Sequence, residues 1–189
     1  MIGILIPAHN EQDLLAQCLQ AALAAGRHPR LNGETVSVVL VLDSCSDRSA
    51  EIAAEFPIHV LHIQARNVGA ARSLGAQWLL KQGARWIACT DADSLVAEDW
   101  LVAQLALNSD AVCGTVAVDD WGSLIDAPAQ ARYHAAYEAC DGHRHIHGAN
   151  LGISARAYRQ AGGFEALSCH EDVQLVKRLQ ACGASIAWS

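Results

Sequence analysis

The chain has 189 residues, of which 52% are hydrophobic and 17% are charged. This composition is typical of a compact globular protein, which excludes an intrinsically disordered chain, and the length suits one domain rather than two. Asp and Glu outnumber Lys and Arg by 20 to 13, giving a net charge of -7 that argues against a general nucleic-acid-binding protein.

The first half of the chain alternates between apolar runs and helical periodicity. In order, we expect strands over 2–6, 36–42, 58–63 and 85–90, with helices over 11–26, 47–56 and 69–82 between them. Pro7 is expected to end the first strand, and Asn10 to cap the helix that follows. This alternation predicts a parallel sheet with helices on both faces and a site at the carboxyl ends of its strands.

Two acidic residues, Asp91 and Asp93, follow the fourth strand with one small residue between them. In an extended segment both side chains face the same side, where they could hold a hard divalent ion such as Mg²⁺ or Mn²⁺ together with substrate phosphates. The alternative is an ordinary turn in which Asp91 caps the backbone and Asp93 is solvated.

The first strand-helix turn reads PAHNEQ and lacks the GxGxxG pattern, so a dinucleotide cofactor is not expected.

The second half of the chain is less regular. It predicts helices over 98–107, 127–140, 155–162 and 171–182, and strands over 111–118 and 185–188. Between them, His143, His145 and His147 alternate and would share one face of an extended segment. They could ligate a transition metal, but a His-rich surface loop beside a substrate cleft is favoured, because no Cys or carboxylate is spaced to complete a tetrahedral site.

Seven cysteines are scattered along the chain without a CxxC pair. They predict small buried thiols in a reducing cytoplasm rather than a disulfide framework or a zinc site. The N-terminal run is too short and lacks the basic residues of a signal peptide, and no stretch approaches the roughly 20 apolar residues of a transmembrane helix. We therefore expect a cytoplasmic protein without a transmembrane segment.

Seven motifs in one order carry a family resemblance: PAHNE, DSCSD, NVGAARSLG, TDADS, GANLGI, GGF and HEDVQLVKRL. Together they cover nearly the whole chain, which resembles the family 2 glycosyltransferases of the GT-A fold. The resemblance implies a Rossmann-like, mostly parallel α/β sheet in a single domain over 1–189. A nucleotide-binding half would span about 1–95, and an acceptor and catalytic half about 96–189.

The resemblance also implies a donor site for a UDP-linked or GDP-linked sugar. Pro7, His9 and Glu11 would line the nucleoside pocket, and Asp43 would accept a hydrogen bond from the base. Arg72 would reach the base or the phosphates, and Asp91 would contact the ribose or a metal-bound water. Asp93 would coordinate Mg²⁺ or Mn²⁺, with Asp91 as its neighbour at the metal.

The same resemblance assigns roles in the second half. Gly148, Ala149 and Asn150 would border the donor sugar, with His147 nearest to it. Asp172 matches the catalytic base of an inverting hexosyltransferase-like enzyme, and Glu171 lies beside it; acids in the first turn also complement the helix dipole, which is the structural alternative.

The sequence departs from the family pattern in three ways, and two other functions are compatible with it. Ser44 replaces an acid of the usual DDGS-like turn, which leaves the nucleobase open, no acceptor motif is matched, and family members usually continue beyond the strand at Ser185. The acceptor could be a small molecule, a lipid-linked carrier or a glycan. The alternatives are a non-catalytic or partner-dependent nucleotide-sugar-binding module and a metal-dependent hydrolase that uses the two acids and the His cluster.

Overall fold

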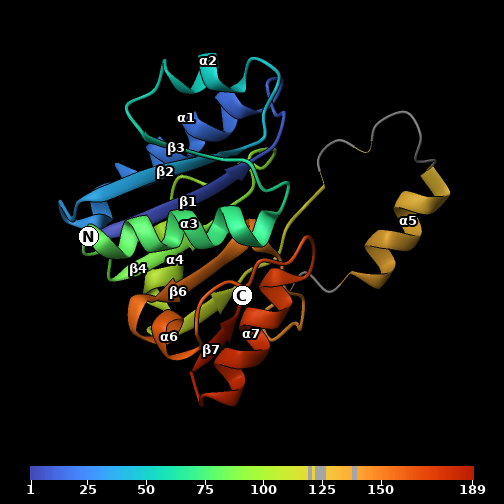
Figure 1. The fold of residues 1–189 in the computed structure, drawn as a ribbon. Helices are drawn as coiled ribbons and strands as arrows, with labels where there is room; N and C mark the ends of the chain where they lie inside the picture. Colours follow the sequence, from blue (N-terminus) through green and yellow to red (C-terminus); the bar gives the residue numbers. More distant parts are fainter. Residues whose placement is uncertain (119–120, 122–126, 138–139) are drawn as a thin grey trace.

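The structure is a computed structural model that describes residues 1–118, 121, 127–137 and 140–189. Its described residues form a seven-stranded sheet in the order β3-β2-β1-β4-β6-β5-β7 (Figure 1). The strands are β1 (Ile2–Ala8), β2 (Val36–Asp43), β3 (His59–Ile63), β4 (Trp86–Cys89), β5 (Ala111–Cys113), β6 (Leu151–Ser154) and β7 (Ile186–Trp188). The helices are α1 (Leu15–Gly26), α2 (Ser49–Ala53), α3 (Val68–Lys81), α4 (Trp100–Ala106), α5 (Ala127–Ala136), α6 (Ala155–Gln160) and α7 (Glu171–Ala181).

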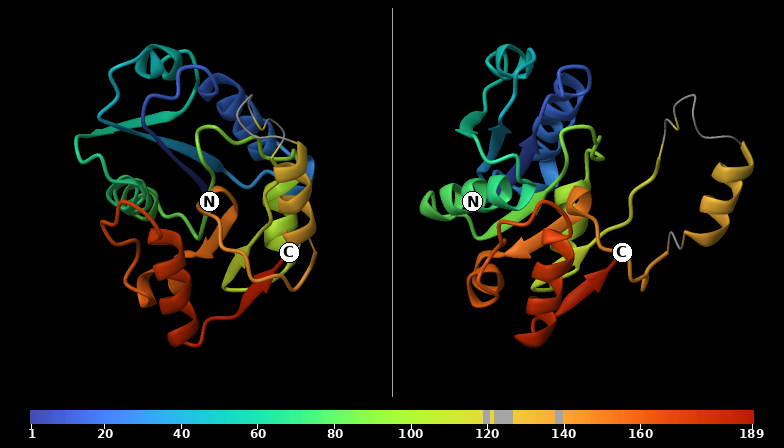
Figure 2. Two further views of the ribbon diagram at one scale, coloured as in Figure 1. Left: turned by 90° about the vertical axis from the view of Figure 1, so that its right-hand side faces the viewer. Right: turned by 45° about the vertical axis from the view of Figure 1, so that its right-hand side comes forward.

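The direction of the strands confirms the expected sheet. Strands β1 to β4 run parallel to one another, β7 runs parallel to β5, and β6 runs antiparallel to both β4 and β5. Helices α1 and α4 cover one face, and α3 and α7 cover the other, as the left view of Figure 2 shows. The carboxyl ends of β1, β2 and β4 therefore meet at one edge of the sheet, as expected for a doubly wound α/β fold.

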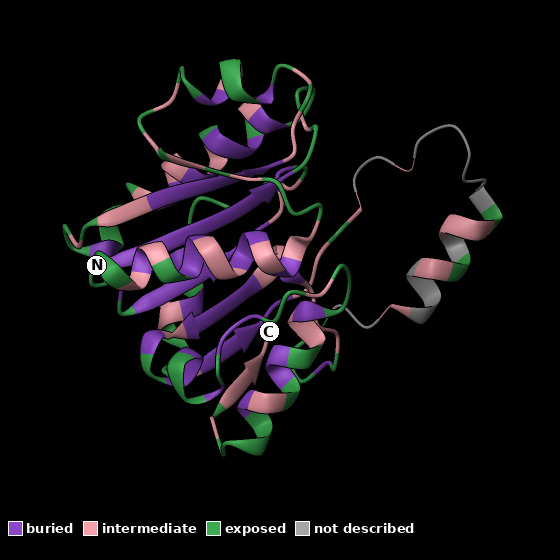
Figure 3. Cartoon of the chain, in the orientation of Figure 1, coloured by how far each residue is buried: buried purple, intermediate pink, exposed green. Residues whose placement is uncertain are grey.

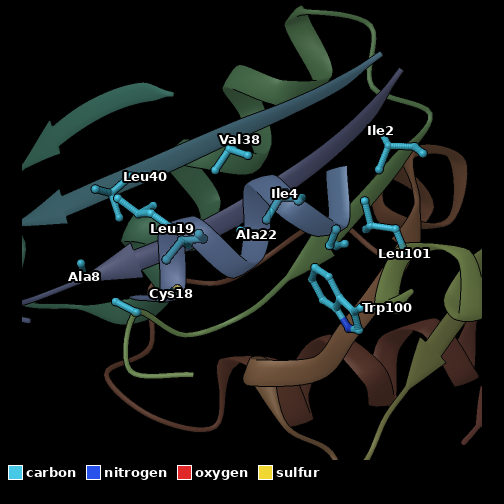
Figure 4. Packing of buried hydrophobic residues seen from close by; sticks show 14 of the residues in the cluster. Ile2, Ile4, Ala8, Cys18, Leu19, Ala22, Val38, Leu40, Trp100 and Leu101 are labelled. Atoms are coloured by element: carbon cyan, nitrogen blue, oxygen red, sulfur yellow. The ribbon is translucent and has the colours of Figure 1, made fainter. Parts of the chain in front are cut away.

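Strand β1 shows why the apolar runs are unbroken. Ile2, Ile4 and Ile6 pack toward α1 and α4, whereas Leu5 belongs to the core on the opposite face (Figure 4). All seven residues of β1 are buried, so the strand lies between two apolar layers, and Figure 3 shows that β4 and the carboxyl-terminal part of β2 beside it are buried as well. Central parallel strands covered on both faces require such continuous apolar sequence.

Strand β6 is absent from the sequence prediction. It has four residues and contains Gly152, which weakens any strand signal. A Cβ at this position would lie 2.6 Å from the ring of Trp86 and would also meet the side chain of Gln104. The glycine therefore allows an aromatic ring and an amide to pack directly against the backbone of β6.

Several predicted boundaries are wrong. Pro7 lies inside β1, which continues to Ala8. Helix α1 begins at Leu15, because Asn10 has a positive φ of 58° and its side chain accepts a hydrogen bond from the backbone N–H of Ser46 instead of capping a helix. Strand β5 ends at Cys113, and the described residues that follow it line a cavity.

Three of the predicted helices are shorter in the structure. The helix expected over 47–56 is only Ser49–Ala53, and that over 98–107 is Trp100–Ala106. The helix expected over 127–140 ends at Ala136, and residues 138–139 lie outside the described residues. Helix α5 stands apart from the sheet in Figure 1.

The prediction of buried thiols is only partly right. Three cysteines are buried and three are exposed: Cys18, Cys89 and Cys113 are buried, Cys45 is half-buried, and Cys140, Cys169 and Cys182 are exposed.

None of the described helices has the length and apolarity that a membrane span requires.

Candidate functional site

Two cavities open at the carboxyl edge of the sheet. The first cavity, of about 530 Å³, is lined by the ends of β1 and β2, by the start of α3 and by the turn after β4. It gathers Pro7, His9, Glu11, Asp43, Asp91 and Asp93 of the predicted site, together with Ala8, Arg66, Asn67, Val68, Ala71 and Ala92. The side chains that the sequence places in a nucleoside pocket thus share one hollow.

The second cavity, of about 980 Å³, lies on the other side of the same turn. His147, Gly148, Asn150 and Asp172 of the predicted site line it, although they come from separate segments of the second half of the chain. Asp91 and Asp93 line both cavities. The acidic pair, here called the acidic wall, therefore borders both cavities.

Asp43 is held by a backbone loop that the sequence does not reveal. Its Oδ1 accepts hydrogen bonds from the backbone N–H groups of Ala65 and Arg66, both at 2.8 Å, and from the Ser44 hydroxyl at 2.9 Å. Its Oδ2 accepts from the Asn67 N–H at 2.7 Å. Burial alone would raise the pKa of Asp43, but these N–H groups stabilise the charged form and leave the pKa lowered. Oδ2 keeps one acceptor direction for a ligand.

His9 and Glu11 form the rim of the first cavity. The Nδ1 of His9 lies 2.6 Å from the backbone oxygen of Asp43, which fixes an otherwise exposed imidazole. The pKa of Glu11 is raised, first by burial and then by the negative charges of Asp93, Asp47 and Asp91. This part of the site is therefore a region of negative potential.

Arg72 and Glu171 lie behind the acidic pair. Arg72 is 1% exposed, forms an ion pair with Asp91, and donates through Nε to Glu171 at 2.9 Å. Its Nη1 is buried without a hydrogen-bond partner in the described part of the chain. The sequence predicts both Arg72 and Glu171 as substrate contacts, whereas the described linings of the two cavities include neither. Arg72 instead fixes Asp91 from within the protein, and Glu171 in turn pairs with Arg72.

Asn150 is part of a network in the wall of the second cavity. Its Oδ1 accepts from Trp100 Nε1 at 2.8 Å and from Gln104 Nε2 at 3.3 Å, and its Nδ2 donates to the Thr115 carbonyl at 2.9 Å. The amide that the sequence assigns to the donor sugar is thus engaged in joining α4 to the segment after β5. Nearby, a Cβ on Gly148 would collide with the guanidinium of Arg72, so a glycine is required there.

The alternating histidines form a stacked column. The rings of His143 and His145 stack at 5.5 Å, and those of His145 and His147 at 6.0 Å. His147 Nε2 lies 3.0 Å from the hydroxyl of Tyr137. Burial first, and then the charges of His145 and His143, lower the pKa of His147, so it is neutral at pH 7. The surface-loop prediction is wrong for His143, which is 1% exposed.

Asp172 occupies the first turn of α7 and faces the second cavity. Its Oδ1 accepts the backbone N–H of Val173 at 2.7 Å. The other carboxylate oxygen has no hydrogen bond from the described residues. Asp172 thus retains an acceptor that could take a proton from a hydroxyl bound in this cavity.

The acidic wall has the chemistry of a divalent cation site. Asp91, Asp93 and Glu11 bring negative charge together; the pKa of Glu11 is raised first by burial and then by the charges of the neighbouring acids, Asp91 and Asp93 among them. Carboxylate oxygens are the ligands that Mg²⁺ and Mn²⁺ prefer. No group of three metal-ligating side chains occurs among the described residues, so a bound substrate would have to complete the coordination.

The sequence analysis does not select two residues that line the cavities, Asn67 and Trp100. Asn67 gives a local signal, since it directly precedes a helical run and its Oδ1 caps the N–H of Ala70. Trp100 gives no such signal, because its role depends on contacts with Asn150, fifty positions away.

The chain matches the family described as Glycosyl transferase family 2 over residues 3–162. No curated protein matches it. Solved structures with a similar fold include Staphylococcus aureus TarS 1-349 in complex with UDP, with 14% identity and a TM-score of 0.73 over 100% of this chain and 57% of that one. A mannosyltransferase from Pyrobaculum calidifontis in complex with GDP-Man and Mn²⁺ has 16% identity and a TM-score of 0.65 over 100% and 56%.

A third similar structure is the glucosyl-3-phosphoglycerate synthase of Mycobacterium tuberculosis with Mn²⁺, UDP and phosphoglyceric acid, with 14% identity and a TM-score of 0.66 over 100% of this chain and 67% of that one. The chain thus spans less than two thirds of the length of the TarS structures. These likenesses confirm the expected GT-A fold. With a family match over most of its length, the chain belongs to glycosyl transferase family 2.

Proposed function

We propose that this chain transfers a sugar, with inversion, from a UDP- or GDP-linked donor to the hydroxyl of an acceptor. One observation carries the proposal: Asp91 and Asp93 line both a cavity that contains Asp43 and His9 and a cavity that contains Asp172. A donor in the first cavity would place its diphosphate at the acidic wall, and its sugar would reach the second.

The first cavity suits a nucleoside. The free acceptor direction of Asp43 Oδ2 can receive an N–H of a base, and the exposed ring of His9 offers a flat surface for stacking. Every residue that lines this cavity lies between positions 7 and 93. This supports a division of the single domain into a nucleotide-binding half over about 1–95 and an acceptor half over about 96–189.

Asp91 and Asp93 would hold a divalent cation, Mg²⁺ or Mn²⁺, together with the donor diphosphate. When bound, such an ion supplies Lewis-acid stabilisation of the diphosphate leaving group. Arg72 orients Asp91 through their ion pair. The mannosyltransferase and the synthase with similar folds were crystallised with Mn²⁺ and a nucleotide ligand, which supports this assignment.

Asp172 would act as the general base. Breaking the anomeric bond gives the sugar carbon oxocarbenium character, and the acceptor hydroxyl attacks from the face opposite the diphosphate. Asp172 faces the second cavity and can take the proton of that hydroxyl as the new bond forms. A single displacement of this kind inverts the anomeric centre, and we propose a hexose as the sugar.

The proposal is tested first by calorimetric titration of UDP and of GDP in the presence of Mn²⁺ and then of EDTA. We expect one of the two nucleotides to bind with Mn²⁺ and to lose its affinity with EDTA. Asp93→Ala should abolish the binding. Asp99→Ala is the matched control, because this exposed acid precedes α4 without capping it and lines neither cavity among the described residues.

Asp172→Asn tests the catalytic half. It should bind the nucleotide like the wild type but release no nucleoside diphosphate from the donor in the presence of an acceptor. Full turnover by Asp172→Asn would exclude its role as base. Retained binding by a wild-type protein that never turns over would instead favour a nucleotide-sugar-binding module.

A further inference from the structure

The described lining of the second cavity combines three acidic side chains with a group of partly exposed apolar side chains, here called the apolar mouth, and this combination restricts what can bind there. We propose that it takes an uncharged acceptor with an apolar group attached close to the reacting hydroxyl, such as a hydroxyl compound with an alkyl chain. This inference rests on the proposed function, because only a transferase has an acceptor. It concerns the chemical class of the ligand that the second cavity binds.

The apolar mouth is built from three separate segments. They are the start of α1, the turn before α4 and the stretch after β5, and they contribute Leu14, Leu95, Val96, Val116, Ala117 and Val118. Leu95 is 60% exposed and Leu14 is 45% exposed. Of the three large apolar side chains that are this exposed in the described part of the chain, two therefore line one cavity, and the third is Leu107.

Such exposure has a cost that a bound apolar group would remove. Leaving a leucine side chain in water forfeits the free energy of its burial, so the clustering of two leucines at one opening is typical of a binding surface. The cavity, at about 980 Å³, has room for a sugar-sized polar group together with an alkyl chain.

Electrostatics excludes an anionic ligand from the same cavity. Its described lining contains Asp91, Asp93 and Asp172 but no Lys or Arg. His147 also lines it, and burial lowers the pKa of that imidazole, so it contributes no positive charge at pH 7. A phosphate or carboxylate on the acceptor would therefore face three carboxylates and no cationic side chain in the described lining of this cavity.

The test compares three probes that share a sugar ring: n-hexyl β-D-glucoside, glucose and glucose 6-phosphate. Their binding to the full chain is measured by calorimetry, without donor and then with the nucleotide and Mn²⁺. The matched variants are Leu95→Ser, at the mouth, and Leu107→Ser, an equally apolar exposed position outside the described lining of the cavity.

We expect hexyl glucoside to bind at least about tenfold tighter than glucose, because several methylene groups leave water. Leu95→Ser should weaken hexyl glucoside binding by roughly fivefold, whereas Leu107→Ser should leave it unchanged. Equal affinity for glucose and hexyl glucoside, equal effects of the two variants, or tighter binding of glucose 6-phosphate would each overturn the inference.

The two proposals fail separately. Absence of nucleotide binding would overturn the transferase role, whereas the comparison of probes without donor tests the preference of the cavity by itself. A protein that binds UDP or GDP but prefers glucose 6-phosphate would retain the proposed function and lose this inference.

Discussion

Arg72 on α3 donates to Glu171 at the start of α7 across 2.9 Å, and the two residues are 99 positions apart in the sequence. Both side chains are buried. The same guanidinium forms an ion pair with Asp91, the residue shared by the two cavities. One buried cation therefore links the acidic wall to the helix that carries Asp172.

Replacing Arg72 by Met should destabilise the protein strongly. The substitution leaves Glu171 buried without its cation, and breaking a buried ion pair in this way costs about 3–5 kcal/mol. Urea unfolding measures the change in the free energy of unfolding. The control is Arg48→Met, which removes the exposed pair between Arg48 and Glu51 and should cost less than about 1 kcal/mol.

A double variant tests whether Arg72→Met is destabilising because Glu171 loses its partner charge or because packing around Arg72 is lost. Arg72→Met combined with Glu171→Leu removes both buried charges, so it should be more stable than Arg72→Met alone. A double variant that is no more stable, or a single variant within about 1 kcal/mol of the wild type, would contradict the account of a buried pair that depends on both partners.

Asp43→Asn should reduce stability most at neutral pH. In the wild type, four hydrogen bonds to the carboxylate lower its pKa, so the stabilisation is present above the unfolded-state pKa of about 4 and is lost as the pH falls through the folded-state value. An amide cannot accept all of these bonds, so we expect a loss of about 1–3 kcal/mol at pH 7.

The measurement is urea unfolding of Asp43→Asn and wild type at pH 7 and pH 3. The difference between the two proteins should shrink at the lower pH, because the wild-type carboxylate then gives up part of its advantage. A difference that stays constant or grows would show that the loop over 65–67 is not held by the charge of Asp43.

The sequence predicts well what depends on neighbouring residues. The apolar runs before Asp43 and Asp91 identify buried strands, and the expectation that their carboxyl ends carry the site agrees with the position of both cavities. Alternating strands and helices suffice to predict that the first four strands are parallel, because each helix returns the chain to the same sheet.

The sequence does not predict features that depend on contacts between residues far apart in the chain. Strand β6 consists of Leu151–Ser154, and it forms only because β4 and β5 already provide edges on both sides of it. Likewise, the N–H groups that fix Asp43 come from residues more than twenty positions later. No local periodicity encodes either relationship, so both emerge only from the folded arrangement.

Asn150→Ala should weaken the fold more than the binding of the nucleotide. The amide of Asn150 joins Trp100 to the Thr115 carbonyl, and its loss leaves the buried indole N–H without that acceptor. We expect a loss of about 1–3 kcal/mol in urea unfolding and a nucleotide affinity within about twofold of wild type, a difference below 1 kcal/mol. A tenfold loss of nucleotide affinity in a fully stable variant would instead assign Asn150 to the donor, as the sequence suggests.

His147 should titrate below the usual range of a histidine. Burial lowers its pKa first, and the charges of His145 and His143 lower it further, while Asp172 and Asp91 oppose them. The unfolded chain therefore binds a proton more readily, so the stability that neutral His147 contributes is present above about pH 6.5 and declines as the pH falls.

The shift can be measured from the C2 proton of the His147 ring by NMR as the pH is changed. We expect a midpoint below about 6.5 in the wild type, and a midpoint closer to 6.5 in His145→Ala, which removes one neighbouring positive charge but not the burial. His28→Ala replaces an exposed histidine far from the column and serves as the control for general effects on the titration. A wild-type midpoint at or above 6.5, or no change in His145→Ala, would show that the stacked column does not keep His147 neutral.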